Sequence, residues 1–230
     1  MTNDLFSLRE EEIFRTLREL NDCDFVIIGG YAVNAYALPR FSVDCDLVIK
    51  DNNALKKIEK LLLKSGYKQQ ELNAEAQYLG SFSRYEKKLE NDFTVSMDIL
   101  IRVVTDRMTG ATFSADWVFD NSAKKALKGK TITEELRVKI INRDALLVMK
   151  MVSCRSTDIR DVFMMLPNAK DKKWIKSEIA LRYSLHDRVQ RIVEKVTSSQ
   201  FRDGLFGVYG SFDQKIFDKH KKAIITFLNE

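Results

Sequence analysis

Two aspartates stand two residues apart inside an otherwise apolar run, SVDCDLVI. The run has the composition of a β-strand, and side chains at positions i and i+2 of a strand lie on the same face. Asp44 and Asp46 should therefore project together, while Cys45 and Leu47 project to the opposite, packed face. Neighbouring carboxylates repel each other and are costly to bury unless something neutralises them. Hard divalent cations such as Mg²⁺ prefer oxygen ligands, so the pair indicates a cation site.

A third aspartate repeats this pattern. Asp98 is the one acid in the second apolar run, FTVSMDILIRVV. If the two runs form neighbouring strands, three carboxylates meet on one face of the sheet. The alternative is that Asp98 lies on a sheet edge and that the Asp44/Asp46 pair caps a turn.

A glycine pair precedes these acids. Gly29 and Gly30 follow the short apolar run FVII and come before an alanine-rich segment. A glycine turn between a strand and a helix leaves backbone N–H groups open, which suits a phosphate. A glycine pair alone is weak evidence, but Asp44 follows Gly30 after 14 residues, and the combination indicates phosphate and metal chemistry together.

The elements that must position these residues can be predicted from periodicity. Ser7 and Glu10 form a capping-box pair, which predicts a helix over 7–20. A strand is expected over 25–28, a helix over 31–38 that Pro39 ends, and a strand over 43–49. A helix that begins at Asn53 as its cap should end at Gly66.

Paired strands are expected near 78–88 and 93–104 and a further strand at about 135–141, and helical patterns dominate afterwards. The fold class is therefore α+β (mixed α/β), with a sheet domain over 1–142 and a helical domain over 143–230. Residues 143–230 carry 17 Lys and Arg against 11 Asp and Glu, a net charge of +6 within a total of +5. A basic half of this kind is compatible with a polyanionic partner.

Composition excludes several classes of protein. The 230 residues are 45% apolar and 31% charged. No apolar segment approaches the roughly 20 residues of a membrane span, and the N-terminus lacks the pattern of a secretory signal. Cys23, Cys45 and Cys154 are odd in number and lack metal-binding spacing, so reduced thiols and a cytoplasmic location are expected.

These motifs resemble those of the DNA polymerase β-type nucleotidyltransferase superfamily. In that family a strand ends in GG or GS, a helix follows, and an Arg-x-(Ser/Thr)-x-Asp-x-Asp strand and a later strand acid complete the pattern. The counterparts here are Gly29, Gly30, Arg40, Ser42, Asp44, Asp46 and Asp98. Gly30 stands where many members have a serine.

A later run, RDALLVMKMVSCRSTDIRDV, resembles a segment of the AbiEii-type toxin branch of that superfamily. Its counterparts are Lys150, Arg155, Asp158 and Asp161. The resemblance covers residues 25–163, whereas the last 65 or so residues match no family.

The resemblance implies a twisted mixed sheet flanked by helices and transfer of a nucleoside monophosphate from an NTP to an acceptor hydroxyl, with release of pyrophosphate. Asp44, Asp46 and Asp98 would be the catalytic residues and would hold two Mg²⁺ ions, with Mn²⁺ as a substitute. Gly29 and Gly30 would cradle the triphosphate. The other implied nucleotide-binding residues are Arg40, Ser42 and Lys150, with Arg155, Asp158 and Asp161 in support.

Simpler interpretations stand beside these assignments. Arg40 could pair with an acid behind the strand, and Lys150 could be a surface lysine whose stem packs on apolar neighbours. Asp158 and Asp161 lie one turn apart and are expected to orient Lys150 or Arg155. His186 and His220 are isolated and are assigned no role. The segment RDGLFGVYGSF has three glycines without a preceding strand, which predicts a loop.

Partners follow from the same resemblance. The acceptor could be RNA (a tRNA end in the toxin-like case), a protein hydroxyl or a small molecule such as an aminoglycoside, and an antitoxin partner is conceivable. The basic helical half favours nucleic acid slightly. The competing hypothesis is a catalytically silent member that binds a nucleotide or a partner protein.

Overall fold

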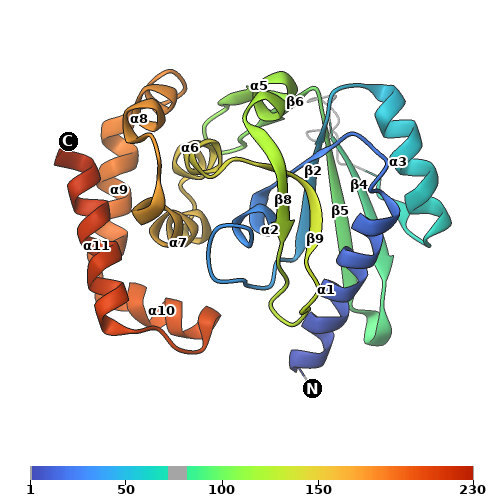
Figure 1. Cartoon of the computed structure of the whole chain (residues 1–230), viewed down its shortest axis with the longest axis horizontal. Coiled ribbons are helices and arrows are strands. Elements are labelled where there is room, and N and C mark those ends of the chain that lie inside the picture. The colour runs from blue at the N-terminus through green and yellow to red at the C-terminus, as the bar shows by residue number, and fades with distance from the viewer. Residues whose placement is uncertain (1, 72–81, 230) are drawn as a thin grey trace. The chain divides into compact units, whose positions relative to one another are not determined.

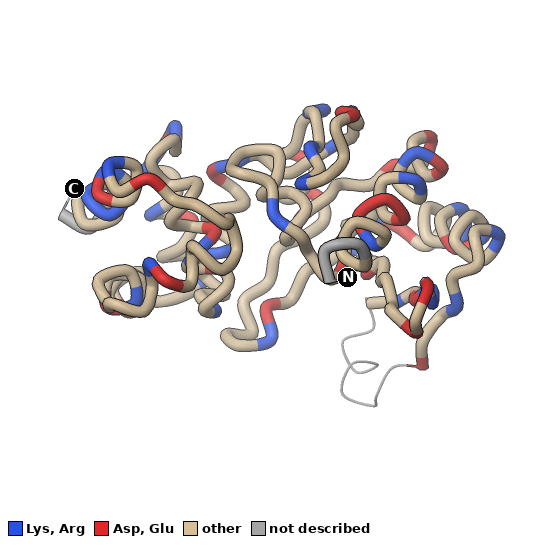
Figure 2. The backbone as a smooth tube through the Cα atoms, turned by 90° about the horizontal axis from the view of Figure 1, so that it is seen from below, with Lys and Arg blue, Asp and Glu red and all other residues tan. Residues whose placement is uncertain are grey.

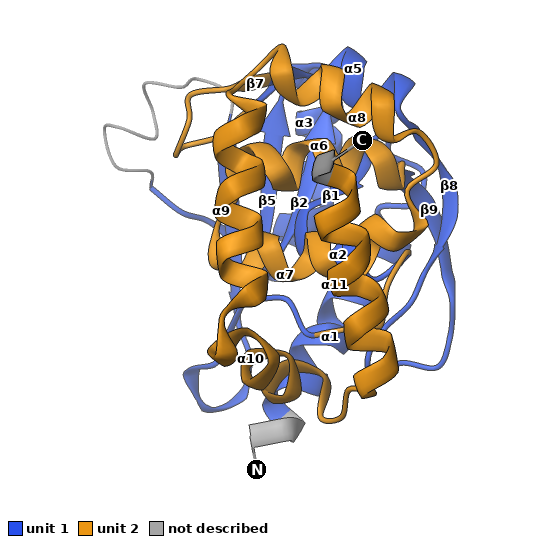
Figure 3. Ribbon diagram, turned by 90° about the vertical axis from the view of Figure 1, so that its left-hand side faces the viewer, with its two compact units in different colours: residues 1–35, 41–104, 113–141 blue, residues 36–40, 105–112, 142–230 orange. Residues whose placement is uncertain are grey.

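The computed structural model describes residues 2–71 and 82–229. The chain divides into two compact units (Figure 3). Unit 1 comprises residues 1–35, 41–104 and 113–141, and unit 2 comprises residues 36–40, 105–112 and 142–230. Two short segments from the N-terminal part of the sequence, 36–40 and 105–112, thus group with the C-terminal helices.

Unit 1 is built on a seven-stranded mixed sheet in the order β3-β4-β5-β2-β1-β9-β8. Strands β2 and β5 are parallel, as are β1 and β9, and the other neighbours are antiparallel. The strands are β1 (Val26–Ile28), β2 (Asp44–Ile49), β3 (Lys68–Gln69), β4 (Phe82–Lys88), β5 (Thr94–Ile101), β8 (Ser122–Leu127) and β9 (Leu136–Ile141). The mixed α/β fold class expected from the sequence is confirmed.

One face of the sheet is covered by α1 (Thr2–Glu19) and α3 (Asn52–Lys64), which lie on the same side in Figure 1. The strand residues that alternate toward this face are apolar and fully buried, including Leu47, Met97 and Ile99. Burial of each such side chain contributes about 1.5–3 kcal/mol. This packing fixes which residues of β2 and β5 must point to the opposite face.

Unit 1 also contains short elements around the sheet. Its described connections include α2 (Gly29–Val33), η1 (Glu90–Asp92) and α5 (Ala115–Asp120). The short strands β6 (Val103–Thr105) and β7 (Thr112–Ser114) lie between β5 and β8 in the sequence and form a separate two-stranded sheet. Of these elements, α2 matters most for the site, because it begins directly at the glycine pair.

Unit 2 is helical. Its elements are α6 (Arg143–Ser153), α7 (Ser156–Met165), η2 (Leu166–Asn168), α8 (Lys172–Ala180), α9 (Leu185–Thr197), α10 (Ser199–Tyr209) and α11 (Gln214–Asn229). The ring of Phe163 packs against those of Phe201 and Phe217, with centroids 5.1 and 5.3 Å apart. The His220 ring also contacts Phe163, and its Nδ1 is 2.9 Å from the Phe163 carbonyl oxygen. His220 is thus part of the packing of this unit.

Several helix boundaries differ from the sequence-based expectations. Helix α1 begins at Thr2, so Ser7 lies inside it and is not its cap. Glu10 instead accepts hydrogen bonds from the backbone N–H groups of Lys130 and Thr131, at 2.7 and 2.8 Å. The Glu10 carboxylate therefore binds a loop that is distant in the sequence, whereas the local pattern assigned it to a capping box.

Three further helices also depart from expectation. Helix α2 ends at Val33, well before Pro39. The cap of α3 is Asp51, whose carboxylate accepts from the N–H groups of Asn53 and Ala54. Residues 199–209 form helix α10, although the glycines predicted a loop.

The expected strand over 78–88 is described only from residue 82, where β4 begins, and its residues 78–81 lie outside the described residues. Strand β8 was not expected from the sequence. Within the described ranges, no helix combines the length and the apolar character that crossing a bilayer requires.

Candidate active site

The three predicted acids lie on one face of the unit 1 sheet. In the parallel pairing of β2 with β5, Asp46 stands opposite Asp98 and Asp44 stands opposite Ser96. Residues that are paired across neighbouring strands point to the same face, and so do residues two apart on one strand. The register therefore groups Asp44, Asp46 and Asp98 on the face opposite α1 and α3.

Gly29 brings the glycine turn against this group. Its φ is +67°, a conformation that side chains disfavour. A Cβ atom at Gly29 would lie 1.9 Å from Oδ2 of Asp46. Both observations explain why this position is glycine: the backbone turns in the left-handed region, and the Asp46 carboxylate lies directly against it.

Arg84 of β4 continues the same row of residues. Its Cα partner in the antiparallel pairing with β5 is Asp98, so that Asp46, Asp98 and Arg84 stand side by side across three strands. The Arg84 guanidinium donates two hydrogen bonds to Asp98, from Nε to Oδ1 at 2.8 Å and from Nη2 to Oδ2 at 2.6 Å. The same Nη2 lies 3.8 Å from Oδ2 of Asp44.

Burial differs among these groups. The Asp98 side chain is 6% exposed, whereas those of Asp44 and Arg84 are 38% and 36% exposed. The hydrogen bonds that Arg84 donates to Asp98, and its attraction to Asp98 and Asp44, raise the pKa of Arg84 above its ordinary value, against the lowering effect of burial. Arg84 thus neutralises part of the row, and its four groups, three carboxylates and one guanidinium, sum to a charge of −2.

The fit of this site to a divalent cation can be judged from its donors. Carboxylate oxygens are the ligands that Mg²⁺ prefers, and the register places three carboxylates on one face. Within residues 2–71 and 82–229, however, no group of three acidic, histidine or cysteine side chains has the geometry of a ready metal site. The donor chemistry suits the cation, and in this structure the Asp98 carboxylate is bound by Arg84.

A second cluster of charges lies within unit 2. Asp161 is completely buried and accepts two hydrogen bonds from Arg40, from Nε at 2.9 Å and from Nη2 at 2.7 Å. Lys150 Nζ lies 2.7 Å from Asp158 Oδ1 and 3.1 Å from Asp161 Oδ2, and its side chain is 12% exposed. Arg160 Nε also lies 3.9 Å from Asp161 Oδ1, so that two acids are surrounded by three bases in this cluster.

The protonation states of this cluster follow from its pairing. Burial alone would raise the pKa of Asp161, but attraction to Lys150 and Arg40 outweighs it and holds that pKa below its ordinary value. Burial would lower the pKa of Lys150, and attraction to Asp161 and Asp158 raises it instead. Asp161 and Lys150 are therefore charged at neutral pH.

The remaining predicted site residues divide between the two units. Gly30 and Ser42 are buried in unit 1, close in sequence to Gly29 and Asp44. Arg155 is in unit 2, where its backbone N–H contacts Asp158 at 3.2 Å and its guanidinium lies 3.3 Å from Asp106. The predicted residues thus form two clusters, one in each unit.

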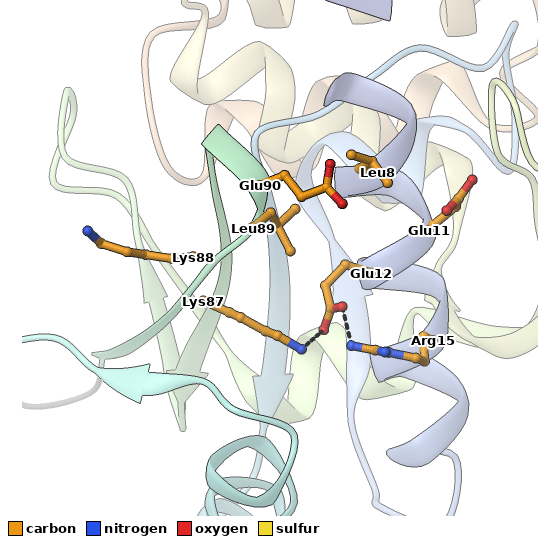
Figure 4. Close-up of a pocket in the computed structure, with 8 residues that line it drawn as sticks. All are labelled: Leu8, Glu11, Glu12, Arg15, Lys87, Lys88, Leu89 and Glu90. Carbon is orange, nitrogen blue, oxygen red and sulfur yellow. Dashed lines mark hydrogen bonds and ion pairs between the residues drawn. The ribbon is translucent and has the colours of Figure 1, made fainter. Parts of the chain in front are cut away.

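A pocket of about 610 Å³ lies between α1 and the end of β4. Figure 4 shows that it is lined largely by charged side chains, and that Glu12 is bound by both Lys87 and Arg15. None of the predicted site residues lines it. Lys87 is three residues from Arg84 along β4, and side chains alternate between the faces of a strand, so the Lys87 side chain lies on the opposite face of the sheet.

Charge is spread rather than concentrated along the chain. Figure 2 shows basic and acidic residues interspersed along the backbone, including the helices of unit 2. The net charge of +6 over residues 143–230 is therefore a general excess and not a single basic segment.

Arg84 is the site residue that sequence reasoning missed. It lies in the run FSRYEKK, whose expected pairing with the strand over 93–104 is confirmed, but the sequence does not reveal the register of that pairing. The available signal was an arginine in a strand of alternating residues, with aromatic and charged neighbours. Such arginines are common on sheet edges. Only the register between β4 and β5 shows that it faces Asp98.

Comparison with known proteins supports the fold. No family model matches the chain, and no curated protein sequence matches it significantly. A crystal structure from H. pylori, of a protein provisionally identified as a nucleotidyltransferase, is similar with a TM-score of 0.52 at 13% sequence identity. The similarity covers 96% of this chain and 93% of the other. At this identity it establishes a nucleotidyltransferase-like fold that spans both units.

Proposed function

We propose that the protein is a metal-dependent nucleotidyltransferase that transfers a nucleoside monophosphate from an NTP to an acceptor hydroxyl. The observation that carries the proposal is the grouping of Asp44, Asp46 and Asp98 on one sheet face, with Asp46 against the Gly29 turn. The nucleotidyltransferase-like fold supports it.

The proposed reaction is an in-line displacement. The acceptor oxygen forms a bond to the α-phosphorus, the bond from that phosphorus to the pyrophosphate oxygen breaks, and pyrophosphate leaves. Asp44, Asp46 and Asp98 would hold Mg²⁺, which when bound neutralises the developing phosphate charge. Asp98, the most buried of the row, would help to accept the proton of the attacking hydroxyl.

The glycine turn has a separate role in this proposal. Gly29 lets the backbone approach Asp46 without a clash, and Gly29 and Gly30 would present N–H groups to the triphosphate. Ser42, two residues before Asp44, would contact the nucleotide on the same side as that aspartate. These contacts orient the substrate and do not themselves break bonds.

Arg40 and Lys150 were predicted to bind the nucleotide, and that assignment stays a prediction. Their bonds to Asp161 and Asp158 favour a structural role, because each base already has a carboxylate partner. Arg155, Asp158 and Asp161 would then support the helical unit and act on catalysis only indirectly.

The acceptor is proposed from charge alone. The net positive charge of residues 143–230 favours an RNA acceptor, such as a tRNA end, over a protein hydroxyl or a small molecule. Membership of the AbiEii-type branch, control by an antitoxin and a cytoplasmic location also remain proposals.

A second candidate function is supported by the position of Arg84. If its bond to Asp98 never opens, three carboxylates do not converge on a cation, and the chain would be a silent member that binds a nucleotide or a partner protein. The two candidates differ in one measurable product, pyrophosphate.

The test is incorporation of label from each α-³²P-NTP, with Mg²⁺ or Mn²⁺, into total RNA, cell protein or small hydroxylated compounds. An active enzyme should label one of these pools, and Asp46→Asn should reduce labelling about a thousand-fold or more, as expected for loss of several kcal/mol of charge stabilisation. Asp116→Asn removes an exposed carboxylate of the same unit and should leave labelling unchanged.

The outcomes separate the candidates. Labelling that persists in Asp46→Asn would show that the acids are not the site. A wild-type protein that binds NTP but never releases pyrophosphate with any acceptor pool would support the silent alternative.

A further inference from the structure

The acid row, Asp44, Asp46 and Asp98, needs a positive charge nearby to offset the repulsion among its carboxylates. Asp46 and Asp98 stand opposite each other on β2 and β5, and Asp44 projects to the same face. Like charges at this spacing repel one another, and the effect is strongest for Asp98, which is almost fully buried. Arg84 supplies the positive charge, with two bonds to Asp98 and a longer contact to Asp44.

We propose that Arg84 is a displaceable counter-ion, which occupies the cation's place between Asp98 and Asp44 and moves to the triphosphate when a cation binds. The proposal rests on the proposed function. Its consequence is that a divalent cation binds weakly to the protein alone and more tightly together with a nucleotide.

The geometry supports displacement. The Arg84 side chain is 36% exposed, so solvent reaches the guanidinium while Asp98 beneath it is nearly covered. A divalent cation brings two positive charges to a row whose carboxylates outnumber Arg84, and it can therefore compete for the same oxygens. A guanidinium also matches phosphate oxygens with two parallel hydrogen bonds, which gives the released Arg84 an alternative partner.

The Arg40–Asp161 pair in unit 2 is an example of a guanidinium that a cation would not displace. Arg40 is buried and bound at two points to the completely buried Asp161, and Lys150 completes the compensation. Arg84 has the same two-point contact but an exposed side chain and an excess of acids around it. The difference is what makes release of Arg84 feasible.

The experiment measures Mn²⁺ binding to the full chain, by the electron paramagnetic resonance of free Mn²⁺, with and without a non-hydrolysable NTP analogue. Arg84→Gln should bind Mn²⁺ alone about ten-fold more tightly than wild type, the change expected when one competing charge–charge contact is removed. The gain in Mn²⁺ affinity that the analogue produces should be smaller in Arg84→Gln than in wild type.

Lys87→Gln is the matched control. It removes one positive charge from the same strand, but on the opposite face, where Lys87 pairs with Glu12. Mn²⁺ affinity should change less than about two-fold, because an exposed charge beyond direct contact is screened by salt. An equal gain in both variants would overturn the proposal, since net charge alone would then explain it.

Two further outcomes are decisive. An Arg84→Gln protein that binds Mn²⁺ no more tightly than wild type overturns the proposal but leaves the proposed function intact, provided that wild-type binding depends on Asp46. Absence of Mn²⁺ binding in every variant, with and without the analogue, overturns both.

Arg84→Lys covers the case in which Arg84→Gln does not fold. It keeps the charge but loses the two-point contact with Asp98, and it should bind Mn²⁺ a few-fold more tightly than wild type, because a lysine makes a less specific contact with a carboxylate. An affinity equal to that of wild type would then count against the proposal. Folding of each variant is checked by circular dichroism.

Discussion

The two clusters of charged residues in this protein contain similar side chains but differ in burial and in net charge. In unit 2, Asp158 and Asp161 are buried, and each has a basic partner among Arg40, Lys150 and Arg160. In unit 1, three aspartates face one arginine, and two of the four side chains are more than a third exposed. Buried acids that are fully paired with bases are costly to unpair, whereas partial exposure with excess negative charge leaves room for a cation.

The comparison explains why residue type alone is a poor guide to function. Lys150 stands in an apolar helix, and Asp98 in an apolar strand, and each appears from the sequence to be an isolated charge that needs an external partner. The structure provides Lys150 with two carboxylates and provides Asp98 with a shared arginine. The balance of the whole cluster, and not the single residue, distinguishes the candidate site.

One prediction concerns activity in unit 1. Gly29→Ala should lower nucleotidyl transfer about a hundred-fold, because the new Cβ would displace the Asp46 carboxylate by an ångström or more. The measurement is the initial rate of label incorporation, together with Mn²⁺ affinity.

Gly110→Ala is the control for backbone strain. Its φ of +72° is similar, but a Cβ there would meet no atom within 4 Å. It should cost about 1–2 kcal/mol of stability, which is the backbone-strain part of the effect of Gly29→Ala, and leave transfer unchanged. If both variants lose transfer equally, strain and not the position of Asp46 is responsible.

The next effect is on stability in unit 2. Asp161→Asn should lower the free energy of unfolding by about 3–5 kcal/mol, because Arg40 and Lys150 would remain buried with an uncompensated charge. Urea denaturation at neutral pH measures it. A loss below 1 kcal/mol would show that the cluster is not the compensated network inferred here.

The same variant gives a pH dependence. The pKa of Asp161 in the folded chain lies below its value in the unfolded chain, which is about 3.9. Its contribution is therefore fully present above that unfolded value and is lost as the pH falls through the lower, folded value. The difference in unfolding free energy between wild type and Asp161→Asn should be constant from about pH 5 to 8 and should shrink below about pH 4.

The smallest effect belongs to a pair of the same unit in which the arginine is exposed and the aspartate, Asp106, is 7% exposed. The Arg155 side chain is 52% exposed and lies 3.3 Å from Asp106. Arg155→Gln should change the free energy of unfolding by less than about 1 kcal/mol, since water and salt screen such a pair. A loss comparable to that of Asp161→Asn would mean that Arg155 belongs to the buried network.

Much of the fold could be predicted from local patterns, and the errors have identifiable causes. Ser7 and Glu10 suggested a helix start, but Glu10 binds the backbone at Lys130 and Thr131, far along the chain. Gly204 and Gly207 lowered the helix propensity of α10 by about 1 kcal/mol each. Burial of Phe201 and Leu205, one turn apart, nevertheless holds that segment helical.

The sequence by itself determined which side chains share a face. Alternation along SVDCDLVI and FTVSMDILI placed Asp44 with Asp46 and set Asp98 among apolar neighbours, because a strand has a fixed period of two. Only the tertiary structure decided that Asp46 stands beside Asp98 and that Arg84 stands on the other side of Asp98. It also decided that Arg40 and Lys150 contact Asp161. Strand order, register and helix packing set those contacts between residues far apart along the chain, and no local pattern encodes them.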